Sequence, residues 1–284
     1  MTIEDTELPE QTEALARALD LLAERTIAAL TGAGLSTDSG IPDYRGANSP
    51  RRTPMTVHDF VGDEAMRRRY WVGSHLGWKA FAATQPNPGH AALAALEDAS
   101  IVTGLVTQNV DGLHLRAGSQ RVVELHGNMR TVTCLVCGTQ FSRHDIAERL
   151  ERDNPVLAVP EEVELGPDGD VLPSTWQTLT VPDCTVCGGT LKPDVVFFGE
   201  YVPKPQTYAA EAIVDEADAL LVAGSSLAVN SGVRLVERAH RRGVPIVIIN
   251  RGPTKGDRRA AVKIDAGTSE TLDALAAALT QSGR

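Results

Sequence analysis

The segment TIAALTGAG, residues 26–34, decides the fold class of this chain. Residues 26–30 form a short apolar run of the length of a buried strand, and the run ends in the turn Thr31–Gly34. Residues 10–23, which come before it, place apolar side chains at helical spacing. The pattern predicts a helix, a buried strand and a tight glycine turn in succession.

The same alternation of strand and helix continues along the chain. Apolar runs that end in polar or glycine residues occur at 101–107, 122–125, 219–223 and 245–250. Helical patterns alternate with them at 88–99, 207–216, 232–242 and 269–280. The alternation predicts an α/β fold, a doubly wound, Rossmann-like, mostly parallel sheet with helices on both faces. In such folds ligands bind beyond the carboxyl ends of the strands, so functional residues are expected directly after each run.

Two segments interrupt the alternation. Residues 50–85 contain the basic, aromatic stretch Met66–Trp71, which predicts a helix, and residues 130–193 contain all four cysteines with a Pro/Gly-rich acidic middle. We expect both to form a second, smaller lobe, helical and zinc-binding. The Rossmann-like domain would then consist of residues 1–49, 86–129 and 194–284.

Composition excludes several classes of protein. The chain has 284 residues, of which 42% are hydrophobic and 23% charged, and no stretch reaches the roughly 18 apolar residues of a membrane-spanning helix. This excludes disordered, collagen-like and membrane-spanning proteins. The net charge of -10 disfavours a nucleic-acid partner. Residues 1–20 show neither a secretory nor a transit signal, so we expect a cytoplasmic protein that binds no membrane.

The four cysteines form two C-x-x-C pairs, each followed by glycine. They are Cys134, Cys137, Cys184 and Cys187. Two such pairs can complete a tetrahedron of thiolates around one Zn²⁺, whereas a redox site would need only one pair. Four thiolates leave no position for water, which predicts a structural zinc. Nucleic-acid binding, the usual alternative for a zinc ribbon, is disfavoured because residues 148–170 hold eight acidic and two basic side chains.

The glycine turn resembles the start of a dinucleotide fingerprint, in which backbone N–H groups approach a pyrophosphate. The third glycine of that fingerprint is replaced by Thr37, and no acidic residue ends a strand about twenty residues later. Phosphate binding is therefore compatible with the sequence, and hydride transfer is disfavoured. A tight turn without ligand stays open at this point.

Polar clusters follow the first two strands. The loop Ser36–Arg45 is polar and rich in turn-forming residues, and residues 107–111 end the next strand with polar side chains. Amide side chains can bind a ribose or a carboxamide, since each offers a donor and an acceptor. Simpler interpretations exist: Asn109 and Asp111 as turn residues, and Asp43 and Arg45 as an ion pair.

His126 follows the run 122–125 and precedes a glycine. Its ordinary pKa of about 6.5 suits a general base near neutral pH. A structural histidine is the alternative, and position alone gives His126 little preference over His114.

Taken together, these motifs resemble the sirtuins, NAD-dependent protein-lysine deacylases. The matching segments run in the family's order and span residues 25–270: 32–36, 40–45, 107–114, 125–127, the two cysteine pairs, 191–200, 224–227 and 249–250. The long separation of the cysteine pairs, with residues 167–170 inside it, resembles the class II subclass that includes mitochondrial sirtuin 4 and bacterial relatives.

The resemblance implies NAD as a consumed co-substrate. The residues it assigns to NAD are Gly32, Ala33, Gly34, Ser36, Ile41, Asp43, Tyr44, Arg45, Gln108, Asn109, Asp111, Gly224, Ser225, Ser226, Asn250, Arg251, Gly252 and Thr268. The glycine turn and residues 224–226 would hold the pyrophosphate, and Asn250 would face the adenosine ribose. Asp43 would bind the carboxamide, and Tyr44 would screen the reactive ribose carbon.

The resemblance also implies the chemistry. The acyl-lysine oxygen would attack C1′ of the ribose as nicotinamide leaves, giving an alkylamidate. His126 would then act as general base on the ribose hydroxyls, with Asn109 and Asp111 beside it as catalytic residues. The products would be lysine, nicotinamide and 2′-O-acyl-ADP-ribose.

The expected partner is a protein or peptide that carries acyl-lysine. By resemblance, an extended peptide adds by backbone hydrogen bonds to an edge formed by residues 196–200 and the stretch after Ser226. The edge residues are Val196, Phe197, Phe198, Gly199 and Glu200. Phe198 and Val196 would line the tunnel for the lysine.

One departure concerns the acyl group. Sirtuins specialised for succinyl and malonyl groups have a Tyr-x-x-Arg pair, whereas here Tyr70 is followed at the third place by Gly73. An acidic acyl pocket is therefore unsupported, and acetyl is not assumed. Mono-ADP-ribosyl transfer on the same scaffold is the alternative activity, and an inactive NAD- or zinc-binding module is a third hypothesis.

Overall fold

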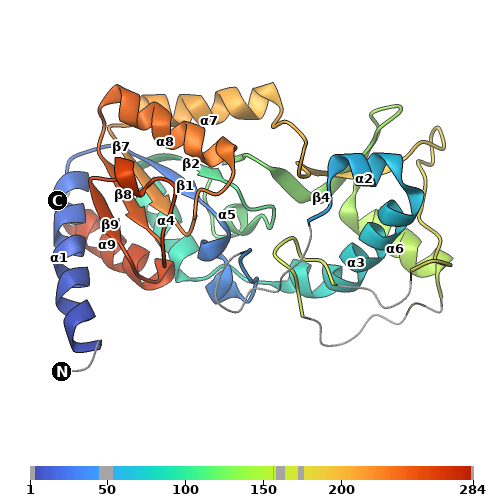
Figure 1. Cartoon of the computed structure of the whole chain (residues 1–284), viewed down its shortest axis with the longest axis horizontal. Coiled ribbons are helices and arrows are strands. Elements are labelled where there is room, and N and C mark those ends of the chain that lie inside the picture. The colour runs from blue at the N-terminus through green and yellow to red at the C-terminus, as the bar shows by residue number, and fades with distance from the viewer. Residues whose placement is uncertain (1–3, 45–53, 156, 158–163, 172–175, 283–284) are drawn as a thin grey trace.

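The large lobe is built on a six-stranded parallel sheet (Figure 1). The computed structural model describes residues 4–44, 54–155, 157, 164–171 and 176–282. The strand order is β3-β2-β1-β7-β8-β9, and every pairing in it is parallel. The strands are β1 (Ile27–Thr31), β2 (Val102–Thr107), β3 (Val122–Glu124), β7 (Ala219–Ala223), β8 (Ile246–Ile249) and β9 (Val262–Ile264). The predicted doubly wound fold is confirmed.

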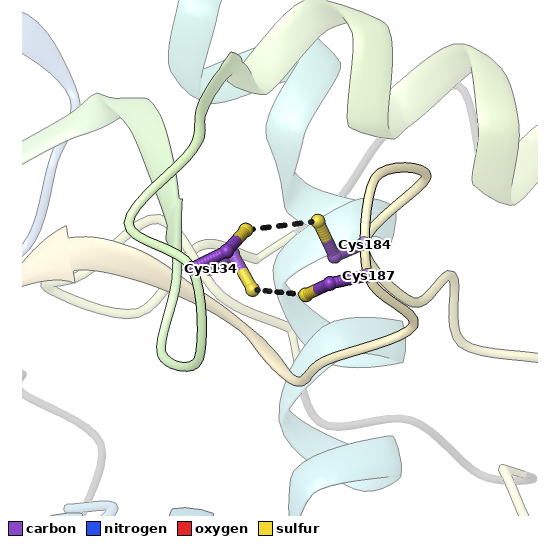
Figure 2. Close-up of side chains that lie close together, drawn as sticks. Cys134, Cys184 and Cys187 are labelled. Carbon is purple, nitrogen blue, oxygen red and sulfur yellow. Dashed lines mark hydrogen bonds between the residues drawn. The ribbon is translucent and has the colours of Figure 1, made fainter.

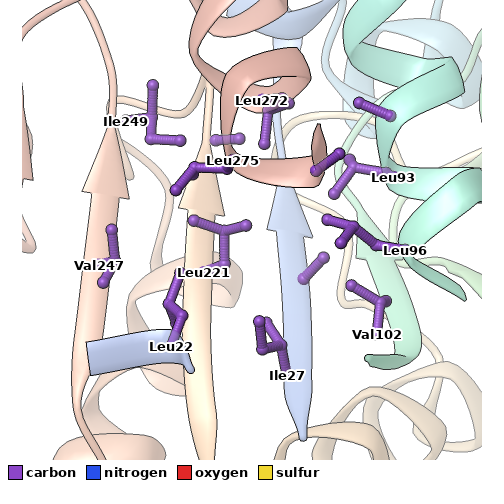
Figure 3. Packing of buried hydrophobic residues seen from close by; sticks show 14 of the residues in the cluster. Leu22, Ile27, Leu93, Leu96, Val102, Leu221, Val247, Ile249, Leu272 and Leu275 are labelled. Atoms are coloured by element: carbon purple, nitrogen blue, oxygen red, sulfur yellow. The ribbon is translucent and has the colours of Figure 1, made fainter. Parts of the chain in front are cut away.

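Helices cover both faces of this sheet because its central strands are apolar on both sides. In β1, Ile27 and Ala29 pack into one core, and Ala28 and Leu30 pack into the other. The first core lies under α1, α4 and α9, as Figure 3 shows for Leu93, Leu96, Leu272 and Leu275. The second lies under α7 and α8. The helices are α1 (Glu4–Leu22), α4 (Pro88–Asp98), α7 (Lys204–Glu216), α8 (Asn230–Arg242) and α9 (Thr268–Ser282).

The order of the sheet reverses between β1 and β7, which are neighbours in space. Such a switch point leaves a crevice beyond the carboxyl ends of the two strands, where ligands of this fold class bind. The edge strand β9 was not predicted from the sequence. It has three residues, and its apolar Val262 and Ile264 flank a lysine, which is too short a pattern to recognise.

The smaller lobe contains a three-stranded antiparallel sheet of order β5-β4-β6. Its elements are α2 (Val57–Gly62), α3 (Glu64–Ala83), β4 (Gly127–Cys134), β5 (Gln140–Ser142), α6 (Arg143–Asp153) and β6 (Leu191–Val195). A core that includes Phe60, Trp71 and Ile146 joins the helices to the sheet. The short helix α5 (Leu113–Arg116) lies between the two lobes (Figure 1). None of the described helices is both long and apolar enough to cross a membrane.

Helix α3 carries a loop of the second insertion on its surface. The amide of Val171 donates to the carbonyl of Gly73 at 3.0 Å. One turn further on, a methyl group on Gly77 would overlap the carbonyl of Gly169. The glycine at position 77 therefore allows residues 166–171 to pack directly on the helix backbone.

We expect Gly77→Ala to destabilise the protein although alanine favours helix. In an open helix position, glycine to alanine stabilises by about 1 kcal/mol, whereas overpacking here costs about 1–3 kcal/mol. Thermal unfolding should show a Tm lower by several degrees, on the order of 2–4 °C per kcal/mol. Gly62→Ala is the control, because nothing lies within 4 Å of its added methyl group. An unchanged Tm for Gly77→Ala would contradict the packing.

Candidate active site and metal centre

The glycine turn after β1 packs backbone to backbone against the turn after β7. The amide of Gly34 donates to the carbonyl of Gly224 at 2.8 Å. A methyl group on Gly32 would lie 2.9 Å from the Gly224 oxygen, and one on Gly34 would lie 3.0 Å from the Gly224 Cα. Gly224 itself has φ +65°, which favours glycine. These contacts bring residues 32–34 and 224–226 together at the switch point.

The chain after the glycine turn does not continue into a long helix. It forms two 3₁₀ turns, Ala33–Leu35 and Thr37–Ser39, and Gly40 ends the second with φ +88°. The buried Ile41 and the half-buried Asp43 follow. A hydride-transfer fingerprint would place a helix here, so the local structure agrees with the missing third glycine.

Ser36, Asn109 and Asp111 form one hydrogen-bonded network in front of the glycine turn. Asn109 Nδ2 donates to the Gly32 carbonyl at 3.0 Å and to Ser36 Oγ at 3.1 Å. Ser36 Oγ in turn donates to Asp111 Oδ2 at 2.8 Å, and the amide of Leu113 donates to Oδ1 at 2.9 Å. Burial raises the pKa of Asp111, against the lowering effect of these two hydrogen bonds. The network fixes three polar side chains at the end of β2.

These residues line an open pocket of about 270 Å³ at the switch point. The lining residues are Ala33, Ser36, Ile41, Tyr44, Gln108, Asn109, Val110, Asp111, Pro167 and Asp168. The last two come from the loop on α3, and Asp168 accepts a hydrogen bond from the Tyr44 hydroxyl. The pocket is thus closed on one side by the small lobe.

His126 lies between β3 and β4 with both ring nitrogens in contact with protein groups. Nδ1 lies 3.0 Å from the Gln108 carbonyl oxygen, and Nε2 lies 2.8 Å from Ser231 Oγ. Burial lowers the pKa of His126, partly opposed by the Gln108 hydrogen bond. A neutral imidazole in this position can accept a proton. Gln108 connects His126 to the pocket, because Gln108 is one of its lining residues. The Gln108 side chain donates from Nε2 to Ser225 Oγ at 2.6 Å.

Residues after β8 and before α9 complete the same edge of the sheet. The buried Asn250 uses Nδ2 to hold the carbonyls of Arg251 and Gly252, at 2.7 and 3.2 Å. Thr268 Oγ1 donates to the Gly34 carbonyl at 3.2 Å, so the start of α9 contacts the glycine turn directly. Arg251 is exposed.

Residues 196–200 form an irregular segment that continues beyond β6. By resemblance these residues are expected to offer an edge for an extended peptide, and the regular strand before them ends at Val195. The Val196 amide donates to the His126 carbonyl at 2.8 Å, and the Phe198 carbonyl accepts from the Val57 amide at 3.0 Å. Gly199 has φ +82°, which interrupts extended backbone.

The two phenylalanines of this segment differ in exposure. Phe197 is buried and stacks on Phe60 with ring centroids 4.9 Å apart. Phe198 is 42% exposed, and its ring lies 6.4 Å from that of Tyr44. Glu200 braces the segment, because its Oε2 accepts from the Phe197 amide at 3.0 Å.

The four cysteine sulfurs lie within 4.8 Å of one another at the far end of β4 and β6. Figure 2 shows the two cysteine knuckles facing each other, with Cys134 and Cys187 sulfurs 3.6 Å apart. Cys137 and Cys184 sulfurs are 3.7 Å apart. A tetrahedron with Zn–S bonds of about 2.3 Å has edges of about 3.8 Å, close to these two distances, so the cluster fits a four-thiolate zinc site.

The knuckles have the backbone that thiolate ligation requires. The amides of Val136 and Val186 donate to the sulfurs of Cys134 and Cys184, both at 3.4 Å. In each pair the glycine that follows has φ near +72°, at Gly138 and Gly188. All four ligand positions are supplied by cysteine, which predicts a structural ion.

The structure brings most of the predicted site residues together and adds three. Arg45 lies outside the described residues. Pro167, Asp168 and Ser231 were not predicted. The turn-forming sequence 167–170 predicts a loop but not its contact with Tyr44, and a serine in the first turn of a helix is common enough to carry no signal.

Comparisons with known proteins agree on one family. A sequence model of the Sir2 family matches residues 32–231. A Mycobacterium avium protein named NAD-dependent protein deacetylase 1 is 52% identical over 280 residues, covering 97% of each chain. The Bos taurus protein named NAD-dependent protein lipoamidase sirtuin-4, mitochondrial, is 46% identical over 272 residues, covering 93% of this chain and 85% of that protein.

Solved structures show the same likeness. The complex described as Sir2-p53 peptide-NAD+ is 31% identical with a TM-score of 0.74, covering 92% of this chain and 96% of that one. The structure of Sir2Tm bound to a propionylated peptide has the same identity, TM-score and coverage.

Removal of zinc should unfold the small lobe selectively. The three tryptophans, Trp71, Trp78 and Trp176, all belong to the two inserted segments, so their fluorescence reports on this lobe alone. We expect chelation, or Cys134→Ser, to shift the emission to longer wavelength, because buried Trp71 becomes exposed to water. Adding Zn²⁺ or Cd²⁺ after chelation should restore it. Unchanged emission after complete removal of the metal would contradict a structural role.

Proposed function

Because the chain belongs to the Sir2 family, we propose that it is an NAD-dependent protein-lysine deacylase. This bears out the resemblance drawn from the sequence, including the likeness to sirtuin 4. The observation that carries the proposal is the pocket at the switch point, where Ser36, Asn109 and Asp111 are linked by hydrogen bonds. His126 contacts the carbonyl of Gln108, the lining residue that precedes Asn109. A module that only binds NAD has no need of a buried neutral base at this place.

NAD is the co-substrate in this proposal and supplies the electrophilic ribose carbon. The acyl-lysine oxygen attacks that carbon and nicotinamide leaves. A ribose hydroxyl then attacks the acyl group, and His126 is the base for this second step. The carbonyl of Gln108 cannot donate, so Nδ1 of His126 carries the ring hydrogen and Nε2 is the basic atom.

The NAD residues are assigned by their order from the glycine turn to α9. We assign the pyrophosphate to the turns 32–34 and 224–226, and the nicotinamide and its ribose to the pocket around Asn109 and Asp111. The adenosine is assigned to Asn250–Gly252 and Thr268. Supporting this order, Thr268 and Gly224 both contact Gly34, so the sites adjoin. Asp43 keeps the carboxamide role implied by the resemblance, and Arg45 stays among the residues assigned to NAD.

The partner is a protein with an acyl-lysine, and we assign its binding to residues 196–200. The Val196 amide bonded to the His126 carbonyl supports this, because it ties the segment to the base. The exposed ring of Phe198 beside Tyr44 supports a role at the mouth of a lysine tunnel. The buried Phe197 contributes by packing rather than by contact with the peptide.

The division into lobes follows the insertions: residues 1–49, 86–129 and 194–284 against 50–85 and 130–193. Strand β4 crosses the limit between residues 129 and 130, and β6 crosses the limit between residues 193 and 194. The two lobes are therefore joined by this pair of strands. A cytoplasmic location is supported by four cysteines that form no disulfide, since reducing compartments preserve free cysteine.

The test is mass spectrometry of the protein incubated with NAD and a panel of acyl-lysine peptides. The panel should carry acetyl, lipoyl, succinyl, glutaryl and long-chain acyl groups, since one relative is named a lipoamidase. We expect one acyl-ADP-ribose product, which identifies the preferred acyl group. ADP-ribose on protein without acyl-ADP-ribose would indicate the transferase instead. Intact NAD throughout would contradict both.

His126→Ala should abolish acyl-ADP-ribose formation. General bases of this kind contribute about 100-fold or more to rate. His144→Ala is the control, because His144 lies on the exposed face of α6. Full activity of the His126 variant would overturn its role.

The pH dependence of kcat should reflect the lowered pKa of His126. The base works when neutral, so the rate is retained above its pKa and falls as the pH drops through it. Because burial lowers that pKa from 6.5, the acid limb should be centred below pH 6.5. An acid limb centred above pH 6.5 would show that another group controls the rate.

A further inference from the structure

A serine of helix α8 contacts the basic nitrogen of His126. Ser231 is the second residue of α8, and its Oγ lies 2.8 Å from His126 Nε2. Nδ1 of the same ring carries the hydrogen, because its partner is the Gln108 carbonyl. The Ser231 hydroxyl is therefore the donor to Nε2.

This contact occupies the acceptor position of the base. A neutral imidazole has one acceptor nitrogen, with a single lone pair in the ring plane. A substrate hydroxyl cannot donate to Nε2 while the hydroxyl of Ser231 does. The Ser231 oxygen, in contrast, retains lone pairs that can accept a hydrogen bond.

Ser231 also lies near Gln108, which lines the pocket, because His126 contacts both residues. Ser231 is half-buried, and the neighbouring Gly232 abuts a pocket-lining residue: a methyl group on Gly232 would lie 3.0 Å from Gln108 Oε1. Gln108 in turn bonds Ser225, at the start of the loop that leads to α8. The hydroxyl thus contacts the base, and the next residue of α8 lies against a side chain that lines the pocket.

We propose that Ser231 relays the proton from the ribose hydroxyl to His126, an inference that rests on the deacylase function proposed above. The ribose hydroxyl donates to Ser231 Oγ. As its proton passes to Oγ, the Ser231 proton passes to Nε2, and the electron pair left on the ribose oxygen forms the bond to the acyl carbon. The π bond between that carbon and the lysine nitrogen of the alkylamidate breaks at the same time, and its electron pair moves to the nitrogen. Ser231 is neutral before and after this step, and His126 becomes imidazolium.

The relay predicts a different effect on each half of the reaction. Exchange of labelled nicotinamide into NAD, measured with an acylated peptide, reports the first step, in which no base is needed. We expect Ser231→Ala to retain this exchange within about twofold while single-turnover formation of acyl-ADP-ribose falls about 100-fold. Ser231→Thr keeps a hydroxyl and should recover most of the rate. Arg234→Ala, at an exposed residue further along α8, is the control.

The number of protons that move in the rate-limiting step can be measured independently. In the wild type, single-turnover rates in mixtures of H₂O and D₂O should curve downward, as two moving protons require. A straight line, or full turnover by Ser231→Ala, would overturn the relay, because the ribose hydroxyl would then reach Nε2 directly. Equal loss of exchange and turnover with a lower Tm would also overturn it in favour of a structural role. Failure of the deacylase function itself would be visible separately, as absence of acyl-ADP-ribose from the wild type.

Discussion

The site depends on one close backbone contact, between the turn after β1 and the turn after β7. These strands are neighbours in the sheet but lie far apart in the chain, and only glycine at positions 34 and 224 lets the two turns touch. Their contact fixes the position of the carboxyl end of β1 relative to that of β7. The network of Ser36, Asn109 and Asp111 is then anchored on the same turn, through the Gly32 carbonyl. A methyl group at the contact would displace all of these groups together.

A second constraint is the pairing of β4 with β6, which connects the cysteine cluster to His126 although the two lie far apart. Strands β4 and β6 pair Gly127 with Val195 at one end and Cys134 with Leu191 at the other. At about 3.3 Å per residue, β4 separates these ends by roughly 20 Å. Zinc would hold together the ends of β4 and β6 at Cys134 and Leu191. At the opposite ends, His126 directly precedes β4 and Val196 directly follows β6. The metal therefore acts through the position of the strands, which agrees with a closed set of four thiolates.

The sequence predicted the parts of this structure that depend on local pattern. The buried strand β7 is apolar throughout, β1 is apolar up to its last residue, Thr31, and the cysteine spacing alone indicates the metal centre. Ser231 and Asp168 could not be found in this way, because their roles depend on where a helix end and a loop dock. For Asp168, docking depends on Gly77, which looks like an unfavourable residue in a helix until the loop that it accommodates is known. Residues 196–200 do not continue the strand β6 although they include β-favouring side chains, because Gly199 and tertiary contacts override that preference.

Two further histidines, His90 and His114, lie near the glycine turn but are less suited than His126 to take up a proton. His114 Nε2 lies 2.9 Å from Thr31 Oγ1, just before the glycine turn, and the ring of His90 lies 4.8 Å from that of His114. Burial lowers the pKa of His114, and it lowers the pKa of His90 to about 4. Both imidazoles are therefore neutral at pH 7 and serve as uncharged hydrogen-bonding supports behind the turn. Of these three imidazoles, the half-buried His126 has the carbonyl partner that favours its protonated form, so a proton taken up from substrate is best accommodated there.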